Sequence, residues 1–400
     1  MSRSANFTAS NVYLARPASQ PDRRDEHRTG EMNGAETLPA AAGQAASRVA
    51  WVDYAKGWCI VLVVTMHSAL GVGLAVGEAG WLHQLVAFAK PFRMPDFFLI
   101  AGLFLGRAIN LPWRAYLDRK VLHFVYFYAL WFLIVLTVKS GELGILAPWP
   151  FLRAYLWGFV EPFSSMWFIQ LLPLLFIAAR LTRDWPPLVV IGAALALHGA
   201  AAAFPGGGVF AMNSVMTGST TLNTFALFLV YFLIGHYARA RIFALAEAAV
   251  AMPLLSVAML VCWALAEQLG VRFGLTDIPG LTIIFGLAGA LAIVAVSALM
   301  ARWRLASWLS YCGRHSLTIY LAFVLPMAAI RLLLLKSGLV ANVGWMSVIV
   351  ASVAIAAPLA LEATMRGTAL AYLFKRPAWT RLGEVGDHAS TQPDAARVLS

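Results

Sequence analysis

The sequence predicts an all-α membrane protein, a polytopic bundle of about ten transmembrane helices. Of its 400 residues, 60% are hydrophobic and only 12% are charged, and the mean hydropathy is +0.74. Soluble domains carry about 25% charged residues, so a water-soluble core is excluded. The second observation is a series of apolar runs close to the roughly 20 residues that a helix needs to cross a hydrocarbon layer.

Ten apolar runs, separated by charged residues, glycine and proline, are long enough or nearly long enough to cross a bilayer. They lie near residues 53–75, 82–107, 120–139, 165–181, 186–204, 222–238, 247–268, 279–301, 314–335 and 343–364. Together they predict a transmembrane domain over residues 48–366. Residues 1–47 contain no signal-peptide core and predict a disordered cytoplasmic tail, and residues 367–400 predict a second cytoplasmic tail.

The basic residues of the loops predict the orientation, because Lys and Arg collect in cytoplasmic loops. With ten spans, alternate loops should be basic. The expected cytoplasmic loops carry Arg107, Arg114, Arg119 and Lys120, then Arg180 and Arg183, then Arg239 and Arg241, and finally Arg302, Arg304 and Arg314. The pattern predicts cytoplasmic N- and C-termini. The net charge of +11 is then explained by basic residues in loops beside the lipid bilayer, and nucleic acid is not expected as a partner.

Metal and cofactor sites are not expected. The three cysteines lie far apart and form no C-x-x-C pair. The histidines at positions 83, 198, 236 and 315 have no ligand-like spacing to one another or to acidic residues. No P-loop or Gly-rich dinucleotide motif occurs in a usable setting. Chemistry is therefore expected to come from organic side chains.

The first span carries a set of ionisable residues, which in a membrane usually mark a site facing the bundle interior. Lys56 and His67 are eleven positions apart, and eleven steps of about 100° nearly complete three turns, so both point the same way. Their Cα atoms are expected about 16 Å apart along the axis. Asp53 lies one turn from Lys56.

Two interpretations of this set are open. In the first, Lys56 extends to the membrane interface beside Asp53, and His67 makes an ordinary interhelical hydrogen bond. In the second, His67 is a general base, because an imidazole titrates near neutral pH, and Lys56 holds an anionic donor.

The second span contains Lys90-Pro-Phe-Arg-Met-Pro-Asp96, in which two prolines are expected to interrupt the helix. Arg93 and Asp96 stand one turn apart and predict either a cavity lining or a structural ion pair. Gly102 has no side chain to pack, and we expect a neighbouring backbone to approach it closely.

These residues resemble the acyltransferase family 3 superfamily of bacterial inner-membrane proteins. The family opens with Asp-x-x-Arg-Gly and a His eleven residues after the Arg, a frame that Asp53, Lys56, Gly57 and His67 occupy. The similarity continues through Met94-Pro-Asp-Phe-Phe-Leu-Ile-Ala-Gly102, Met166-Trp-Phe168, Phe232-Leu-Ile-Gly235 and Gly313-Arg-His-Ser-Leu-Thr-Ile-Tyr320, over about residues 48–365.

The resemblance implies an inner-membrane enzyme that moves an acetyl or other short acyl group from acyl-CoA to a hydroxyl of a cell-envelope glycan, as in O-acetylation of polysaccharides. Acyl-CoA would be a substrate and no cofactor would be bound. His67, with Asp53 and Lys56, would form the catalytic set. Residues that would contact the donor phosphates or the acceptor are Arg93, Asp96, Arg107, Arg119, Lys120, His123 and Trp167.

Three departures from the family pattern limit this transfer of roles. Lys56 replaces an Arg, which keeps the charge but loses the bidentate fork that grips phosphate. Lys120 and His123 stand in place of the family's Arg-x-x-Arg, and Phe323 stands where many relatives carry His. The alternative functions are a transporter or flippase for a lipid-linked or anionic molecule, in which the same charges line a path, and a scaffold without chemistry.

Overall fold

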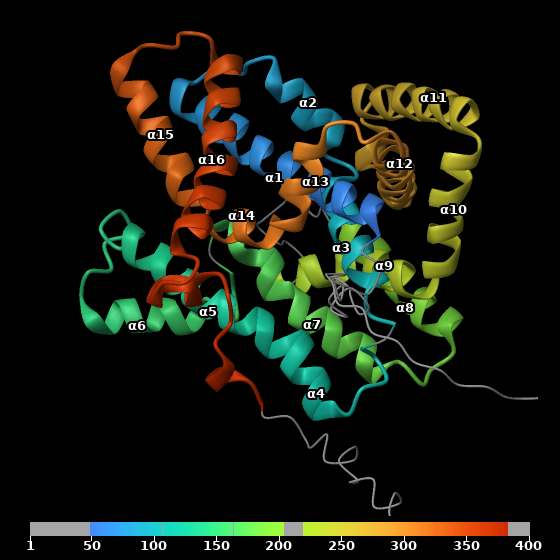
Figure 1. Ribbon diagram of the computed structural model, residues 1–400, viewed down its shortest axis with the longest axis horizontal. Coiled ribbons are helices and arrows are strands. Elements are labelled where there is room, and N and C mark those ends of the chain that lie inside the picture. The colour runs from blue at the N-terminus through green and yellow to red at the C-terminus, as the bar shows by residue number, and fades with distance from the viewer. Residues whose placement is uncertain (1–48, 107, 163, 204–218, 383–400) are drawn as a thin grey trace, which may run out of the picture. The chain divides into compact units, whose positions relative to one another are not determined.

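The computed structural model describes residues 49–382 apart from 107, 163 and 204–218, and every regular element in that part of the chain is helical (Figure 1). The predicted N-terminal tail and Arg107 thus lie outside the described residues. Six helical stretches are long and apolar enough to cross a membrane. They are α1 (Ala50–Val76), the continuous α4 (Trp113–Leu117), η2 (Asp118–Leu122) and α5 (His123–Lys139), α9 (Thr220–Tyr237), α11 (Pro253–Arg272), α12 (Leu281–Trp303) and α16 (Val343–Met365).

The other expected spans contain shorter or broken helices. These are α2 (Leu82–Ala89) with α3 (Arg93–Leu103), α7 (Trp167–Leu181), α8 (Pro187–Ala203), and α14 (Ser316–Ala322) with α15 (Val324–Ser337). The last pair is bent by 56° and would add a seventh crossing if it forms one span. The described residues therefore form an all-α, multi-pass membrane protein with six or seven helices of spanning length.

Several short elements lie at the edges of the expected spans, between them or after the last one. Short helices occur at α6 (Pro148–Trp157), α10 (Arg239–Ala251) and α13 (Ser307–Arg314), and single turns at η3 (Ser164–Met166), η4 (Leu275–Asp277), η5 (Ala369–Leu373) and η6 (Ala378–Thr380). The span expected at residues 247–268 is shifted, because Pro253 begins α11 at a position where its missing N–H is not needed.

The second expected span is broken once rather than twice. Helix α2 ends at Ala89 and α3 begins at Arg93, with Pro91 in the gap. Pro95 lies in the first turn of α3, where the backbone N–H groups have no helical partner in any case. Both prolines are compatible with this break, which turns Arg93 and the start of α3 toward the bundle.

Helix α1 is the central element of the bundle. It packs against α3, α12, α13 and α16, and much of its length is buried. The Ser68 hydroxyl donates a 2.6 Å hydrogen bond to the Ser347 carbonyl of α16. Most of α1 is thus held between neighbouring helices rather than facing lipid.

Glycines allow two pairs of helices to approach backbone to backbone. A Cβ atom on Gly102 of α3 would overlap the Phe232 carbonyl of α9, and a Cβ on Gly235 of α9 would overlap the Leu99 carbonyl of α3. In the same way, Gly313 of α13 leaves no room for a Cβ beside the Asp53 carbonyl of α1. The prediction that a neighbouring backbone approaches Gly102 is confirmed.

The reciprocal glycine contact between α3 and α9 predicts an effect on stability. We expect Gly235→Ala to lower the free energy of unfolding by about 1–3 kcal/mol, because the added methyl group meets a backbone oxygen that cannot move alone. Gly192→Ala is the matched control, since a Cβ there meets nothing within 4 Å and alanine favours a helix. Denaturant unfolding of detergent-solubilised protein measures both, and equal effects would contradict this account.

Candidate active site

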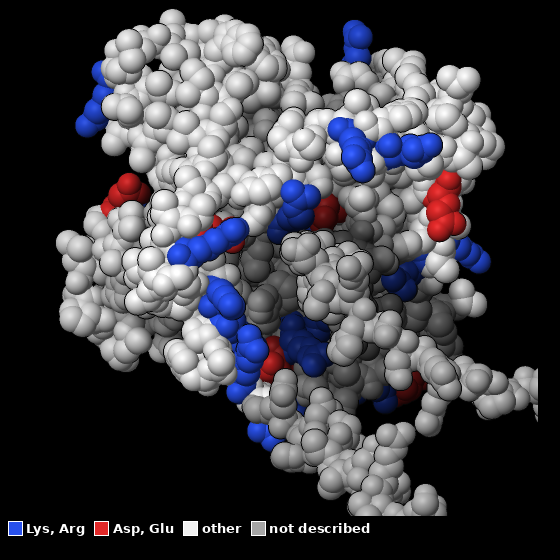
Figure 2. All heavy atoms as spheres, viewed as in Figure 1, with Lys and Arg blue, Asp and Glu red and all other residues white. Residues whose placement is uncertain are grey.

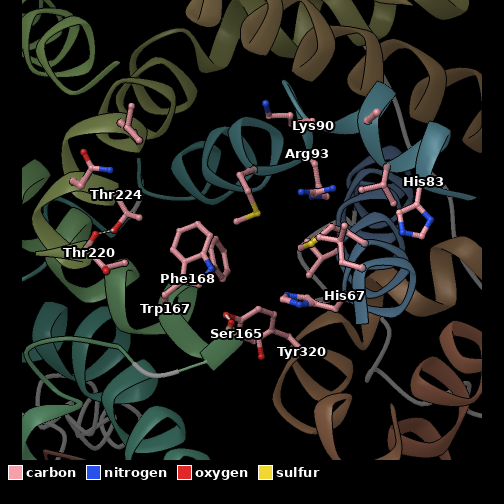
Figure 3. A pocket seen from close by; sticks show the side chains of 18 residues that line it. His67, His83, Lys90, Arg93, Ser165, Trp167, Phe168, Thr220, Thr224 and Tyr320 are labelled. Atoms are coloured by element: carbon pink, nitrogen blue, oxygen red, sulfur yellow. Dashed lines mark hydrogen bonds between the residues drawn. The ribbon is translucent and has the colours of Figure 1, made fainter. Parts of the chain in front are cut away.

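His67 points from α1 into a cavity of about 500 Å³, which we call the apolar cavity (Figure 3). Its wall is predominantly apolar. The lining residues are Val63, Met66, His67, Leu70, His83, Val86, Ala87, Lys90, Arg93, Met94, Ser165, Trp167, Phe168, Thr220, Asn223, Thr224, Leu227 and Tyr320. The cavity therefore draws together α1, α2, α3, α7, α9 and α14, with an imidazole in its wall.

His67 also lines a second cavity of about 410 Å³, which we call the charged cavity. Its lining residues are His67, Leu70, Gly71, Leu74, Lys139, Glu142, Ser165, Phe323, Val324, Met327, Ala328 and Arg331. A Cβ on Gly71 would lie 2.5 Å from the Arg331 Nη1 atom, so the guanidinium covers α1 directly there. Three residues line both cavities, namely His67, Leu70 and Ser165. His67 thus stands where two chambers of different character meet.

Three polar side chains of the apolar cavity are hydrogen-bonded or ion-paired to other residues. Lys90 forms a 2.8 Å ion pair with Asp277, and the Thr224 hydroxyl donates to the Thr220 carbonyl of its own helix. The Tyr320 hydroxyl donates to the Ser165 carbonyl. These three side chains therefore have protein partners, and most of the remaining wall is apolar.

The immediate neighbours of His67 combine an apolar ring with a buried hydroxyl. The Phe323 ring centroid lies 5.4 Å from that of His67, so one of the three departures from the family pattern contacts this imidazole directly. The Ser165 hydroxyl is buried and has no hydrogen-bond partner among the described residues. His67 and Ser165 are the polar groups that both chambers share.

Arg93 and Asp96 point in different directions from α3. Arg93 is only 1% exposed and, like His67, lines the apolar cavity (Figure 3). Asp96 is turned toward α1, where its carboxylate accepts a 2.9 Å hydrogen bond from the Cys59 thiol. The structural ion pair considered from sequence is not formed, and Arg93 is the member of the pair that belongs to the cavity.

Lys56 and Lys120 lie together near the N-terminal end of α1. The Lys56 Nζ atom is 5.1 Å from the Phe104 ring centroid, and the Lys120 Nζ atom donates a 3.3 Å hydrogen bond to the Phe104 carbonyl. Neither lysine lines the two cavities around His67. On the face drawn in Figure 2, several Lys and Arg side chains lie across the middle of the molecule. The structure thus separates a basic region from the histidine.

The other residues predicted for the site are scattered. Asp53 is buried at the contact of α1 with α13, and Arg119 is exposed. His123 packs edge to face against Phe127, with ring centroids 5.1 Å apart. Trp167 does line the apolar cavity. Among the described residues, no group of three or more His, Cys, Asp or Glu side chains is placed to hold a metal ion.

Two polar residues of the site had no signal of their own in the sequence. Ser165 precedes the Met166-Trp-Phe168 motif, and Asn223 lies near the start of α9. Asn223 is 2% exposed, lines the apolar cavity and leaves its Oδ1 atom without a hydrogen-bond partner in the described part of the chain. A Ser or Asn in an apolar run is common, so only the assembled fold distinguishes these two.

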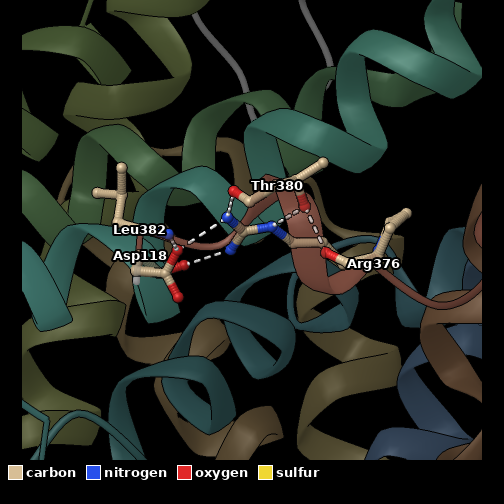
Figure 4. Close-up of polar contacts among 5 residues, drawn as sticks. Asp118, Arg376, Thr380 and Leu382 are labelled. Atoms are coloured by element: carbon tan, nitrogen blue, oxygen red, sulfur yellow. Dashed lines mark hydrogen bonds and ion pairs between the residues drawn. The ribbon is translucent and has the colours of Figure 1, made fainter. Parts of the chain in front are cut away.

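A strap formed by residues 369–382 holds the π-helical segment η2, which carries Lys120 (Figure 4). The Arg376 guanidinium donates 2.8 Å hydrogen bonds to the Asp118 carbonyl and to its carboxylate, and the Leu382 N–H donates to the same carboxylate. Trp131 of α5 donates to the Leu373 carbonyl. The beginning of the predicted C-terminal tail is therefore part of the folded structure.

Comparisons with known proteins give one family match. The model described as "Acyltransferase domain" matches residues 49–361. The chain is also similar to the inner membrane protein YcfT of Escherichia coli (strain K12), with 25% identity over 154 residues. That alignment covers 33% of this chain and 43% of YcfT, so the chain matches less than half of that relative's length. No solved structure gives a significant match.

The ion pair between Arg376 and Asp118 predicts that the strap stabilises η2. We expect Arg376→Gln to lower the free energy of unfolding by about 1–3 kcal/mol, because it removes charge-assisted hydrogen bonds from a carboxylate that is only 17% exposed. Arg183→Gln is the control, since its partner Asp184 is 79% exposed and such surface pairs contribute about 0–1 kcal/mol. Thermal unfolding, together with proteolysis after residue 366, measures the difference; equal losses would contradict the proposed strap.

Proposed function

The chain belongs to the acyltransferase family whose model spans residues 49–361, and on that premise we propose that it transfers an acyl group from a thioester to an acceptor hydroxyl. The observation that carries the proposal is the position of His67 between an apolar and a charged cavity. General-base catalysis needs the base within hydrogen-bond reach of the acceptor hydroxyl while that hydroxyl faces the thioester carbonyl. A residue that lines both chambers meets that requirement.

In the proposed reaction, His67 accepts the proton of the acceptor hydroxyl as its oxygen attacks the thioester carbonyl carbon. The carbon–sulfur bond then breaks, the new ester is released, and the thiolate leaves as the thiol after receiving a proton. A thioester already favours transfer, so general-base action and alignment supply modest acceleration, about 10²–10⁴-fold. Arg93, buried on the same cavity, is placed to stabilise negative charge that develops during the attack.

The donor is proposed to be acyl-CoA, and Lys56 and Lys120 to bind its phosphates. Two ammonium groups converge on Phe104, and clustered positive charge attracts a polyanion. Single ammonium groups bind phosphate as point charges rather than through a fork. This assignment matches a donor held at one end of α1 while its thioester reaches His67, about 16 Å along the helix.

The acceptor is proposed to be a glycan or related polyol of the cell envelope, bound in the charged cavity. Lys139, Glu142 and Arg331 line that cavity and provide donors and acceptors for hydroxyl and acidic groups. With the topology expected from sequence, ten crossings and both termini in the cytoplasm of a bacterial inner membrane, the lysine end of α1 faces the cytoplasm. The charged cavity then faces outward.

The first test of this function is His67→Ala. We expect incorporation of label from radiolabelled acyl-CoA into cell-envelope glycan fractions to fall by about 10²–10⁴-fold, because the base is removed. The control is Thr65→Ala, on the same helix at a residue that lines neither cavity. Both proteins should show the same unfolding temperature. The proposal would be rejected if the His67→Ala variant still transferred label. It would also be rejected if the unmodified protein transferred label from no donor.

The same assay separates the transporter alternative. A transporter moves its substrate across a vesicle membrane without forming a covalent product, so label would accumulate inside vesicles and be released by detergent. An ester of the acceptor resists detergent and is cleaved by mild base.

The second test concerns Lys56. We expect Lys56→Ala to raise KM for acyl-CoA by about tenfold or more with little change in kcat, because it removes a charge-assisted contact that ground state and transition state share. Lys56→Arg should restore most of the affinity. Lys336→Ala, which removes an exposed lysine at the end of α15, is the control.

A truncated donor sharpens this test. With an acyl thioester of N-acetylcysteamine, which has no phosphates, Lys56→Ala and the unmodified protein should have the same KM. A tenfold effect that persists with the truncated donor would assign Lys56 a structural role instead.

A further inference from the structure

We propose that the apolar cavity holds the hydrocarbon chain of the transferred acyl group, and that the enzyme prefers medium-chain acyl groups to acetyl. This inference rests on the proposed function and specifies its donor. It follows from the size, lining and position of the cavity, each of which is independent of the others.

The cavity is much larger than an acetyl group requires. Taking about 30 Å³ per carbon, the volume of a water molecule of similar size, an eight-carbon chain fills about half of its 500 Å³. An acetyl group leaves most of that space unoccupied. Apolar cavities of this kind are poorly hydrated, so a longer chain displaces little ordered water.

The chemistry of the wall favours hydrocarbon over sugar. Met94, Trp167, Phe168 and Leu227 contribute apolar side chains, while the ammonium group of Lys90 is engaged with Asp277. Each methylene moved from water into such a wall improves binding by up to about fourfold. A sugar would instead lose hydrogen bonds to water that the few polar groups of this wall, among them Arg93 and Asn223, replace only in part.

The position of the cavity places the chain correctly for transfer. His67 and Ser165 lie in its wall (Figure 3), and both also line the charged cavity. A carbonyl carbon beside His67 can therefore extend its chain into the apolar cavity while a hydroxyl approaches from the charged one. The two substrates then occupy separate chambers, and the polar acceptor is assigned to the chamber that carries charge.

The test measures binding of S-octyl-CoA and S-ethyl-CoA, thioethers that cannot be cleaved, to the full-length protein in lipid nanodiscs. We expect calorimetry to give a dissociation constant for S-octyl-CoA at least about tenfold lower than that for S-ethyl-CoA. This expectation allows for the entropy lost when the chain is ordered. Because no acceptor is needed, the measurement does not depend on turnover.

Substitution of Ala87 locates the chain. Ala87 lines the apolar cavity and is exposed, so Ala87→Phe fills the cavity without displacing the core. We expect it to reduce the octyl-to-ethyl ratio to below about threefold. Ala75→Phe is the matched control, since Ala75 is also exposed but lines neither cavity, and it should keep the ratio.

The outcomes separate this inference from the proposed function. A ratio near one, or a ratio that Ala87→Phe leaves unchanged, overturns the medium-chain assignment while the acyltransferase proposal stands. Binding of neither thioether rejects acyl-CoA as donor, and the inference falls with it. If Ala87→Phe leaves the ratio unchanged but weakens use of a lipid-linked acceptor, the cavity holds the acceptor's lipid and the assignment to the acyl chain is wrong.

Discussion

Close contact between helix backbones at glycine is the constraint on which the rest of this structure depends. Lipid tails are as apolar as the helices, so helices in a membrane gain little from hydrophobic burial and associate mainly through packing and interhelical hydrogen bonds. Gly57 and Gly313 allow α1 and α13 to meet, and Gly102 and Gly235 allow α3 and α9 to meet. These two crossings fix α1 and α3, which carry His67 and Arg93.

The sequence predicted the parts of the fold that follow from local chemistry. The long helix around Lys56 and His67, the interruption near Pro91 and the packing role of Gly102 all depend on residues within one segment. The number of spans, in contrast, depends on how the helices pack against one another. Helices α7 and α8, of 15 and 17 residues, are shorter than the roughly 20 residues of a full crossing, which hydropathy alone does not reveal.

The candidate site was predictable where a charged or titratable residue is unusual for its surroundings. His67 and Arg93 stand out in apolar runs, whereas Ser165 and Asn223 do not, because neutral polar residues are tolerated in helix contacts. The contact of the strap residue Arg376 with Asp118 joins positions 258 residues apart. No local sequence pattern predicts such a contact. Asp96 shows the converse, since its spacing from Arg93 suggested a pair, whereas its carboxylate accepts a hydrogen bond from Cys59 of α1.

The contact between His67 and Phe323 sets a condition on the proposed reaction. A phenyl ring neither takes nor gives a proton, whereas the histidine that many relatives carry at this position can do both. In this chain, the proton that His67 takes from the acceptor hydroxyl has no second imidazole at position 323 to receive it. We infer that the same imidazolium returns it to the leaving thiolate, acting first as a base and then as an acid within one turnover. That requires the hydroxyl and the thioester sulfur to lie within reach of one ring, which is the geometry that a residue shared by two cavities provides.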